Sequence, residues 1–315
     1  MPEDARTAGA GGASGEAMAD RAGPDGVAES PGGADVTVVS ERGVERLGIV
    51  SYTNVAPLHW RLRPWSTDAG AVEFVRGVPT ELNAALLAGD IDLTLISSIE
   101  FVLHRRELRA LPDFSISTLG PVYSVMLFHW RPWPELRGGR IAVTTDSATS
   151  VALLDVLLEH DGLAAELVPM PSDLDAMLDA CDAALLIGDA ALREAVAQRP
   201  VGLDQRRPLV TDLGEAWYHV TRLPFTFAVW ASRADRKPSD RLVREFRAAR
   251  EEGLGHLAEV AREEAARLGL PLGVVQRYLA NFRYYLELPD RDGLLAFARR
   301  CDPSFEDHDL RYWDV

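Results

Sequence analysis

The sequence predicts an α/β protein with two lobes and mostly parallel sheets. Short apolar runs alternate with amphipathic stretches along most of the chain, which is typical of strands joined through helices. The 315 residues, 47% of them hydrophobic, can bury a large core, and a chain of this length more often forms two lobes than one. Residues 1–44 are rich in Gly, Ala, Asp and Glu and hold no aromatic residue, so we expect a disordered tail there.

Local signals mark the elements of the first half. Pro79 and Thr80 are typical of a helix start and Gly89 of a helix end, and a serine opens the next helix. Apolar runs mark the strands between them. The expected elements are strand 46–52, helix 79–90, strand 91–97, helix 98–108 and β-rich segments at 115–120 and 123–130.

The second half continues the alternation. Hydroxyl residues occupy the first turn of the helix expected over 147–162, and Gly162 follows its last turn. The expected elements are strand 140–145, helices 147–162 and 173–181, a strand running into a helix at 182–192, strand 224–232 and long helices from about residue 236.

The composition excludes several classes of function. The formal charge of −15, from 33 basic against 48 acidic residues, argues against a nucleic acid or a membrane surface as the main partner. It leaves room for a small anion in a local pocket. The single lysine, Lys237, lies in a polar, loop-like stretch, so Schiff-base chemistry, pyridoxal phosphate and a P-loop are excluded. The oligomeric state stays open.

Metal-binding and export signals are missing as well. The seven histidines form no HxxxH or HExxH pattern, and Cys181 and Cys301 stand alone, so we expect structural thiols and no metal. No apolar segment follows a basic start, and no run approaches the roughly 20 apolar residues of a membrane span. We therefore expect a cytoplasmic protein.

Polar residues gather where an expected strand ends or the next helix begins. The clusters are SYTN (51–54), ISS (96–98), TLGPVYS (118–124), TTDSATS (144–150) and IGDA (187–190). Ligands bind at the carboxyl ends of strands in open α/β sheets, so the clusters predict a ligand site. Ser147, Thr149 and Ser150 could bind a carboxylate with the first N–H groups of their helix, although Ser147 could also simply cap it.

The other clusters also have a structural alternative. Ser97 and Ser98 could cap the helix that follows or contact a ligand, and Asp189 fits an N-cap better than an acid or base. Asn54 could cap as well, but the run SYTN is more polar than capping requires. Four aromatic side chains could form the wall of a site for a flat apolar ligand: Trp217, Tyr218, Phe225 and Phe227. Core packing is the better explanation for Phe227 and for Trp230.

Six motifs in this order closely resemble the chorismate dehydratases of the futalosine-dependent menaquinone pathway. The resemblance covers about residues 46–300. The motifs are SYTNVAPLHW, GVPTELNAALLAGDIDLTLISSIEF, LPDFSISTLGPVYSVMLF, SATSVALLDVLLE, DAALLIGDAAL and LPFTFAVWAS.

The resemblance implies a fold like that of type II periplasmic solute-binding proteins, with a ligand cleft between two α/β lobes. The chain would cross between the lobes near residues 131–139 and return through 225–232. Lobe one then holds residues 45–132 and 228–315, and lobe two holds residues 133–227. Members of this family are cytoplasmic and use the cleft as an active site.

The implied reaction is the loss of water from chorismate, giving 3-[(1-carboxyvinyl)oxy]benzoate without a metal or other cofactor. Asn54 and Ser124 are the catalytic positions that the motifs imply. Many relatives have an aliphatic or aromatic residue where this chain has Thr53, a change that could alter the polarity of the pocket. The implied substrate-binding positions are Ser51, Tyr52, Ser97, Ser98, Gly120, Ser147, Thr149, Ser150 and Asp189.

The identity of the base stays open, because an amide and a serine hydroxyl are poor bases near neutral pH. One solution is that the enolpyruvyl carboxylate of the substrate takes the ring proton, with Asn54 and Ser124 fixing its geometry. Asp189, Glu100 and His59 are the competing bases. Two other functions share the implied fold: the dihydroxynaphthoate synthase of the same pathway, and a protein that only binds an aromatic or dicarboxylate ligand.

Overall fold

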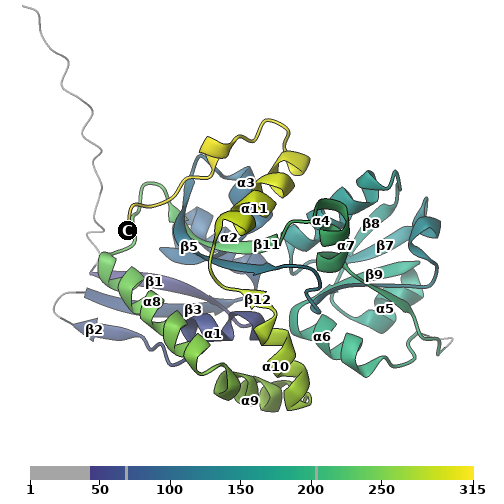
Figure 1. The fold of residues 1–315 in the computed structure, drawn as a ribbon, viewed down its shortest axis with the longest axis horizontal. Helices are drawn as coiled ribbons and strands as arrows, with labels where there is room; N and C mark the ends of the chain where they lie inside the picture. The colour runs from purple at the N-terminus through teal and green to yellow at the C-terminus, as the bar shows by residue number, and fades with distance from the viewer. Residues whose placement is uncertain (1–42, 68–69, 203–204) are drawn as a thin grey trace, which may run out of the picture. The chain divides into compact units, whose positions relative to one another are not determined.

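Two β-sheets form the framework of the protein (Figure 1). The computed structural model describes residues 43–67, 70–202 and 205–315, and the tail expected at residues 1–44 lies almost wholly outside them. The larger sheet has the strand order β12-β5-β11-β4-β1-β3-β2, and the smaller has the order β10-β6-β9-β7-β8. Two sheets with helices packed on them confirm the predicted α/β class.

The strands follow the apolar runs of the sequence, and three of those described, β4, β6 and β9, are buried along their whole length. The larger sheet contains β1 (Val44–Val50), β2 (Trp65–Thr67), β3 (Gly70–Gly77), β4 (Leu93–Ser97), β5 (Leu108–Thr118), β11 (Phe225–Arg233) and β12 (Phe282–Arg283). The smaller sheet contains β6 (Val125–His129), β7 (Arg140–Thr144), β8 (Glu166–Met170), β9 (Ala183–Ile187) and β10 (Leu209–Asp212).

The sheets are mixed, so the prediction of mostly parallel sheets is wrong. Among the described residues, four strand pairs are parallel and six are antiparallel. Each sheet has three consecutive parallel strands, β3-β1-β4 in one and β8-β7-β9 at the edge of the other. The strands that follow a passage between the sheets, β6 and β11, run antiparallel to their neighbours because they enter from the opposite direction.

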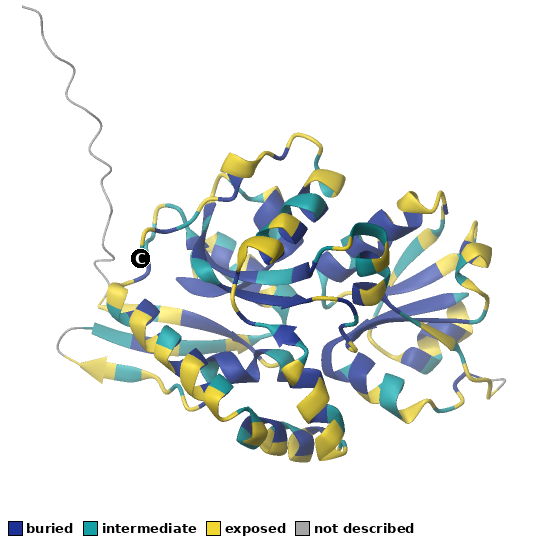
Figure 2. Cartoon of the chain, in the orientation of Figure 1, coloured by how far each residue is buried: buried dark blue, intermediate teal, exposed yellow. Residues whose placement is uncertain are grey.

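Helices cover both sheets and bury their apolar faces against them; Figure 2 shows exposed residues mainly on the outer faces. They are α1 (Ala56–His59), α2 (Pro79–Ala88), α3 (Ser98–Leu103), α4 (Ala148–His160), α5 (Leu174–Ala180), α6 (Gly188–Ala197), α7 (Leu213–Thr221), α8 (Asp240–Gly255), α9 (Leu257–Leu268), α10 (Leu272–Ala280) and α11 (Leu288–Cys301). Three 3₁₀ turns are η1 (Thr53–Val55), η2 (Trp133–Leu136) and η3 (Asp307–Asp309).

Local chemistry sets the ends of these helices. Pro79 begins α2, and Gly89 ends it with a left-handed φ of 81°, as the sequence predicts. The helix expected at 98–108 is wrong in length: α3 ends at Leu103, and β5 begins at Leu108. The stretch 108–114 contains Pro112 and charged residues and gives no clear strand signal, but its residues 108–110 pair with β11.

The chain passes between the sheets twice. It leaves β5 and enters β6 through residues 119–124, and it returns from α7 to β11 through residues 222–224. The boundary expected at residue 132 therefore falls after β6, which belongs to the smaller sheet. The boundary expected at residues 227–228 falls inside β11.

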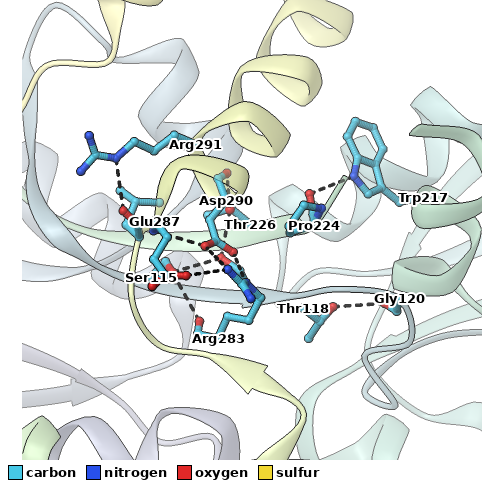
Figure 3. A network of polar contacts seen from close by, with 12 residues as sticks. Ser115, Thr118, Gly120, Trp217, Pro224, Thr226, Arg283, Glu287, Asp290 and Arg291 are labelled. Atoms are coloured by element: carbon cyan, nitrogen blue, oxygen red, sulfur yellow. Dashed lines mark hydrogen bonds and ion pairs between the residues drawn. The ribbon is translucent and has the colours of Figure 1, made fainter. Parts of the chain in front are cut away.

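The return passage is fixed by a buried polar network (Figure 3). Trp217 Nε1 donates to the carbonyl of Pro224 at 3.1 Å, and Thr226 Oγ1 donates to the carbonyl of Asp290 at 3.0 Å. Arg283 binds both carboxylate oxygens of Asp290, at 2.7 and 3.0 Å, and Asp290 is fully buried. A buried carboxylate needs such a paired, hydrogen-bonded partner. This network holds α11 against β11.

Candidate active site

A cavity lies where the ends of β1, β4 and β9 meet the start of α4, so both sheets contribute to its wall. Its polar lining comes from six residues: Tyr52, Asn54, Ser97, Ser124, Ser147 and Ser150. The rest is apolar: Val50, Val55, Pro79, Leu95, Ile116, Val122, Val125, Ile187, Gly188, Phe227 and Ala228. Among the described residues, the lining includes no Asp, Glu, His, Lys or Arg.

The segment SYTN enters this wall directly after β1. Ser51 is exposed, whereas the following residues turn into η1 and α1, where Pro57 occupies the first turn. The side-chain oxygen Oδ1 of Asn54 is buried and accepts no hydrogen bond within the described protein. A buried acceptor without a partner costs roughly 1–3 kcal/mol, and a ligand that donates to it would recover that cost. Asn54 is therefore poised to bind a ligand.

Tyr52 lines the cavity from the segment that follows β1 of the larger sheet. Its ring packs on Gly188, where an added Cβ would lie 3.1 Å from the ring, and Gly188 has a left-handed φ of 61°. Glycine meets both demands at once. Burial raises the pKa of Tyr52, and the nearby carboxylates of Asp146 and Asp189 raise it further. The phenol therefore stays protonated and can donate a hydrogen bond.

Ser124 lies at the end of the first passage between the sheets, in the motif GPVYS. Asp212 holds this segment through the N–H groups of Val122, at 2.9 and 3.0 Å, and Tyr123, at 2.7 Å. Tyr123 adopts a left-handed φ of 63°. The Oγ of Ser124 accepts a hydrogen bond from the hydroxyl of Tyr278 at 2.9 Å. The sequence analysis did not single out Tyr278, which lies on α10, more than 150 residues away.

Ser147 and Ser150 bring the start of α4 to the cavity. Ser147 caps the helix, because its Oγ accepts from the N–H of Ser150 at 3.2 Å, and it also donates to the hydroxyl of Ser150 at 3.0 Å. The capping interpretation and a place in the lining are thus both correct for Ser147. Thr149 does not line the cavity: its Oγ1 accepts from the N–H of Ile99 at 3.0 Å.

Of the two serines that end β4 and begin α3, only Ser97 lines the cavity. Asn83 donates to its Oγ at 3.1 Å and accepts from its N–H at 3.3 Å. Ser98 is fully buried and donates to the carbonyl of Thr226 at 2.6 Å. Neither serine caps α3 through its side chain, and the cavity lining does not include Gly120, whose carbonyl accepts from Thr118.

Asp189 belongs to an ionic cluster outside the cavity lining. It accepts from the N–H of Thr53 at 3.1 Å and pairs with Arg267 of α9 at 2.7 Å. Thr53 Oγ1 accepts from Arg267 at 2.7 Å and donates to Glu264 at 2.9 Å. Thr53 is fully buried in this cluster, so its hydroxyl adds no polarity to the cavity. The cluster ties the SYTN segment to α6 and α9.

The two other candidate bases also lie outside the lining. Glu100 pairs with His104 at 3.6 Å on α3. Burial lowers the pKa of His59 to about 4, the charge of Arg76 adds to the effect, and His59 Nε2 makes no hydrogen bond within the described protein. His59 is therefore neutral at pH 7, and it contacts the backbone of the lining residue Val50 without lining the cavity itself.

One aromatic residue of the proposed wall reaches the cavity. Phe227 lines it, although its ring also packs edge-on against Phe225, with centroids 4.6 Å apart. Trp217 and Phe225 are fully buried and pack against each other, and Trp230 packs against Phe246. The core-packing interpretation is thus confirmed for Trp230 and incomplete for Phe227.

The described residues offer neither a metal-binding cluster nor a membrane-spanning helix. They contain no group of three or more His, Cys, Asp or Glu residues that could hold a metal ion. The described helices include none that is long and apolar enough to cross a membrane. Cys181 and Cys301 are both free thiols, and burial raises the pKa of each, to about 11 for Cys301.

The fold is that of a periplasmic-binding-protein-like α/β protein, with a cavity between its two sheets. Solved structures agree on this fold: a protein of Archaeoglobus fulgidus has a TM-score of 0.64 and 21% identity, with 84% of this chain and 98% of that one covered. The periplasmic aliphatic sulphonate binding protein of Escherichia coli has a TM-score of 0.57 and 17% identity, covering 86% and 92%.

Sequence comparison defines the family more closely. The model of a menaquinone biosynthesis family matches residues 45–303. The chain is also 47% identical over 267 residues to the chorismate dehydratase of Thermus thermophilus, which covers 82% of this chain and 96% of the relative. The chain belongs to the menaquinone biosynthesis family.

Proposed function

We propose that this protein is a chorismate dehydratase, which removes water from chorismate to give 3-[(1-carboxyvinyl)oxy]benzoate. The ring carbon that bears the enolpyruvyl ether loses its proton, the neighbouring carbon loses its hydroxyl, and the ring becomes aromatic. The observation that carries the proposal is the high identity to the Thermus thermophilus enzyme over most of both chains. As in the family that the sequence resembles, we place the activity in the cytoplasm.

The chemistry of the cavity supports this substrate. Chorismate carries two carboxylates on a compact, partly apolar ring. The lining offers hydroxyl and amide groups from both sheets, beside an apolar wall that includes Phe227. The start of α4 adds N–H groups and the positive end of a helix dipole, which favour an anion. We propose that Ser147 and Ser150 bind one carboxylate there.

We also propose that the substrate supplies its own base. The described lining holds no carboxylate or imidazole, and the three candidate bases are engaged or buried elsewhere. The enolpyruvyl carboxylate is attached next to the proton that must leave, so proximity favours its use. Asn54 and Ser124 would hold that carboxylate in place, with Tyr52 as a further donor.

The two lobes would be built on one sheet each, with residues 119–124 and 222–224 as the passages between them. Such passages act as hinges when a ligand closes a cleft. The Asp189–Arg267 pair at 2.7 Å joins α6 of the smaller sheet to α9, so it would break when the cleft opens. Small-angle scattering with and without product tests this proposal, since compaction on binding is expected.

Incubation of the pure protein with chorismate tests the proposed function. A new benzoate-type absorbance and a product lighter than chorismate by one water are the expected results. Asn54→Leu is the matched control, because it alters the cavity and leaves the core unchanged. Tight binding of chorismate without turnover would replace the proposal with a binding protein. A protein that neither binds chorismate nor turns it over would reject chorismate as the substrate.

A further inference from the structure

Tyr278 stands directly behind Ser124 at the cavity wall. It is a fully buried residue of α10, and its hydroxyl donates to Ser124 Oγ at 2.9 Å. Its ring packs edge-on against Phe282, with centroids 5.1 Å apart. Tyr278 does not line the cavity itself, so any effect on a ligand there must pass through Ser124.

The hydrogen bond decides what Ser124 can do. A serine hydroxyl carries one proton and two acceptor sites. Tyr278 occupies one acceptor site, and the proton of Ser124 has one other protein partner, the carbonyl of Val122 at 3.4 Å, which is a long contact. Burial raises the pKa of Tyr278, so its phenol keeps its proton and remains a donor. Ser124 is therefore free to direct its own proton into the cavity.

The same arrangement occurs at a second serine of the lining. Asn83 is buried behind Ser97 and donates to its Oγ at 3.1 Å. In both places a buried donor occupies an acceptor site of a cavity serine. Filling one of its two acceptor sites biases such a serine towards donating its proton, which suits an oxygen anion better than an amine.

We propose that Tyr278 is a positioning residue, which makes Ser124 a fixed hydrogen-bond donor to the enolpyruvyl carboxylate of the bound substrate. The inference rests on the proposed function for the identity of that carboxylate. It assigns to α10, far along the chain from the motif GPVYS, a part in the reaction. Asn281 adds to this role of the segment, because its Nδ2 donates to the carbonyl of Pro121 at 2.5 Å.

The chain offers a matched control for the hydroxyl of Tyr278. Tyr284 is also fully buried, and its hydroxyl donates to the carbonyl of Leu279 at 3.5 Å, away from the cavity lining. Tyr278→Phe and Tyr284→Phe therefore remove the same atom from similarly buried rings. Only the first change should affect the reaction.

The experiment measures chorismate turnover for the wild type, Tyr278→Phe, Tyr284→Phe, Ser124→Ala and the double variant Tyr278→Phe/Ser124→Ala. We expect Tyr278→Phe to lower kcat/KM about ten- to a hundredfold, the range of one charge-assisted hydrogen bond, and Tyr284→Phe to change it less than about twofold. The double variant should be no slower than Ser124→Ala, because Tyr278 acts only through Ser124.

Normal turnover in Tyr278→Phe, or an additive loss in the double variant, would overturn the inference. So would a Tyr278→Phe protein that melts far below Tyr284→Phe, since that result assigns the hydroxyl a structural role. If the wild type does not turn over chorismate, the proposed function fails first. Calorimetric binding of 3-[(1-carboxyvinyl)oxy]benzoate then tests Tyr278 separately. We expect Tyr278→Phe, and not Tyr284→Phe, to lose about tenfold or more in affinity. Equal affinity in the two variants would count against the role of Tyr278.

Discussion

Two sets of buried hydroxyl groups, with two pairs of chain neighbours divided between them, have opposite surroundings. The first set lines the cavity: Ser97, Ser124 and Ser150. The second set belongs to the framework: Ser98, Thr149 and Thr226. Each framework hydroxyl is bound to a backbone group: Ser98 donates to the carbonyl of Thr226, Thr149 accepts from the N–H of Ile99, and Thr226 donates to the carbonyl of Asp290. Each cavity hydroxyl instead accepts from a side chain and faces the site.

The comparison shows that position in the chain does not separate the two sets. Ser97 and Ser98 are neighbours, as are Thr149 and Ser150, yet each pair divides between cavity and framework. Successive residues of a helix point about 100° apart and successive residues of a strand point to opposite faces, so adjacent residues rarely face the same way. Changes in the cavity set should therefore affect the reaction, and changes in the framework should affect stability.

Asn54 gives the largest expected effect on the cavity side. Asn54→Leu should abolish turnover with the fold intact, because the buried Oδ1 makes no hydrogen bond within the described protein that folding would lose. Asn54→Asp sets a negative charge in a lining without a basic side chain, next to a dianionic substrate. We expect the barrier to rise by about 2–4 kcal/mol, which is a slowing of about thirty- to a thousandfold.

Turnover and thermal melting, measured side by side, check both variants of Asn54. An Asn54→Asp protein as active as the wild type would show that a base at this position replaces the substrate's own carboxylate, and it would reject the substrate-assisted mechanism. A large drop in melting temperature would move Asn54 to the framework side of the comparison.

Gly253 gives the largest expected effect on the framework side. A Cβ at Gly253 would lie 1.9 Å from the carbonyl oxygen of Pro57, so α8 would have to move away from α1. Gly255, in the same helix, has no atom within 4 Å of an added Cβ. We expect Gly253→Ala to lower the free energy of unfolding by about 3 kcal/mol, and Gly255→Ala to leave it unchanged or raise it by up to about 1 kcal/mol.

Chemical denaturation of the two glycine variants measures this difference. Equal stabilities would mean that α8 can shift on α1 without cost. Because α1 follows the SYTN segment directly, the turnover of Gly253→Ala at low temperature also tells whether such a shift reaches the cavity.

His59 should make the framework sensitive to mild acid. Burial lowers its pKa from 6.5 to about 4, so the unfolded chain takes up a proton near pH 6.5 while the folded chain stays neutral. The free energy of unfolding should therefore fall as the pH drops from about 6.5 towards 4, by about 2 kcal/mol between pH 7 and pH 5. Denaturation of the wild type and His59→Leu across this range isolates the effect, since the stability of the wild type relative to His59→Leu should fall with acid by that amount. A constant difference would reject it.

Much of the fold was predictable, because apolar runs, Pro79, Gly89 and the cap at Ser147 are local signals. The residues at the cavity were predictable in kind, since hydroxyls and an amide gathered at strand ends. The sequence could not show which of two adjacent residues faces the cavity. Nor could it show the partners that come from distant helices, such as Tyr278 behind Ser124 or Arg267 beside Asp189, because no local pattern links them.

Thr149 and Ser150 allow the smallest and most specific test of the comparison. Thr149→Val keeps the shape of the side chain but leaves the N–H of Ile99 without its acceptor, which should cost about 1–2 kcal/mol of stability and leave chorismate binding within about twofold. Ser150→Ala keeps the backbone cap from Ser147 and removes a cavity hydroxyl. It should melt like the wild type and bind chorismate roughly tenfold more weakly. Calorimetric binding and thermal melting of both variants measure these effects. Weaker binding in Thr149→Val than in Ser150→Ala would reverse the assignment of the two hydroxyls. It would also contradict the placement of a substrate carboxylate at the start of α4.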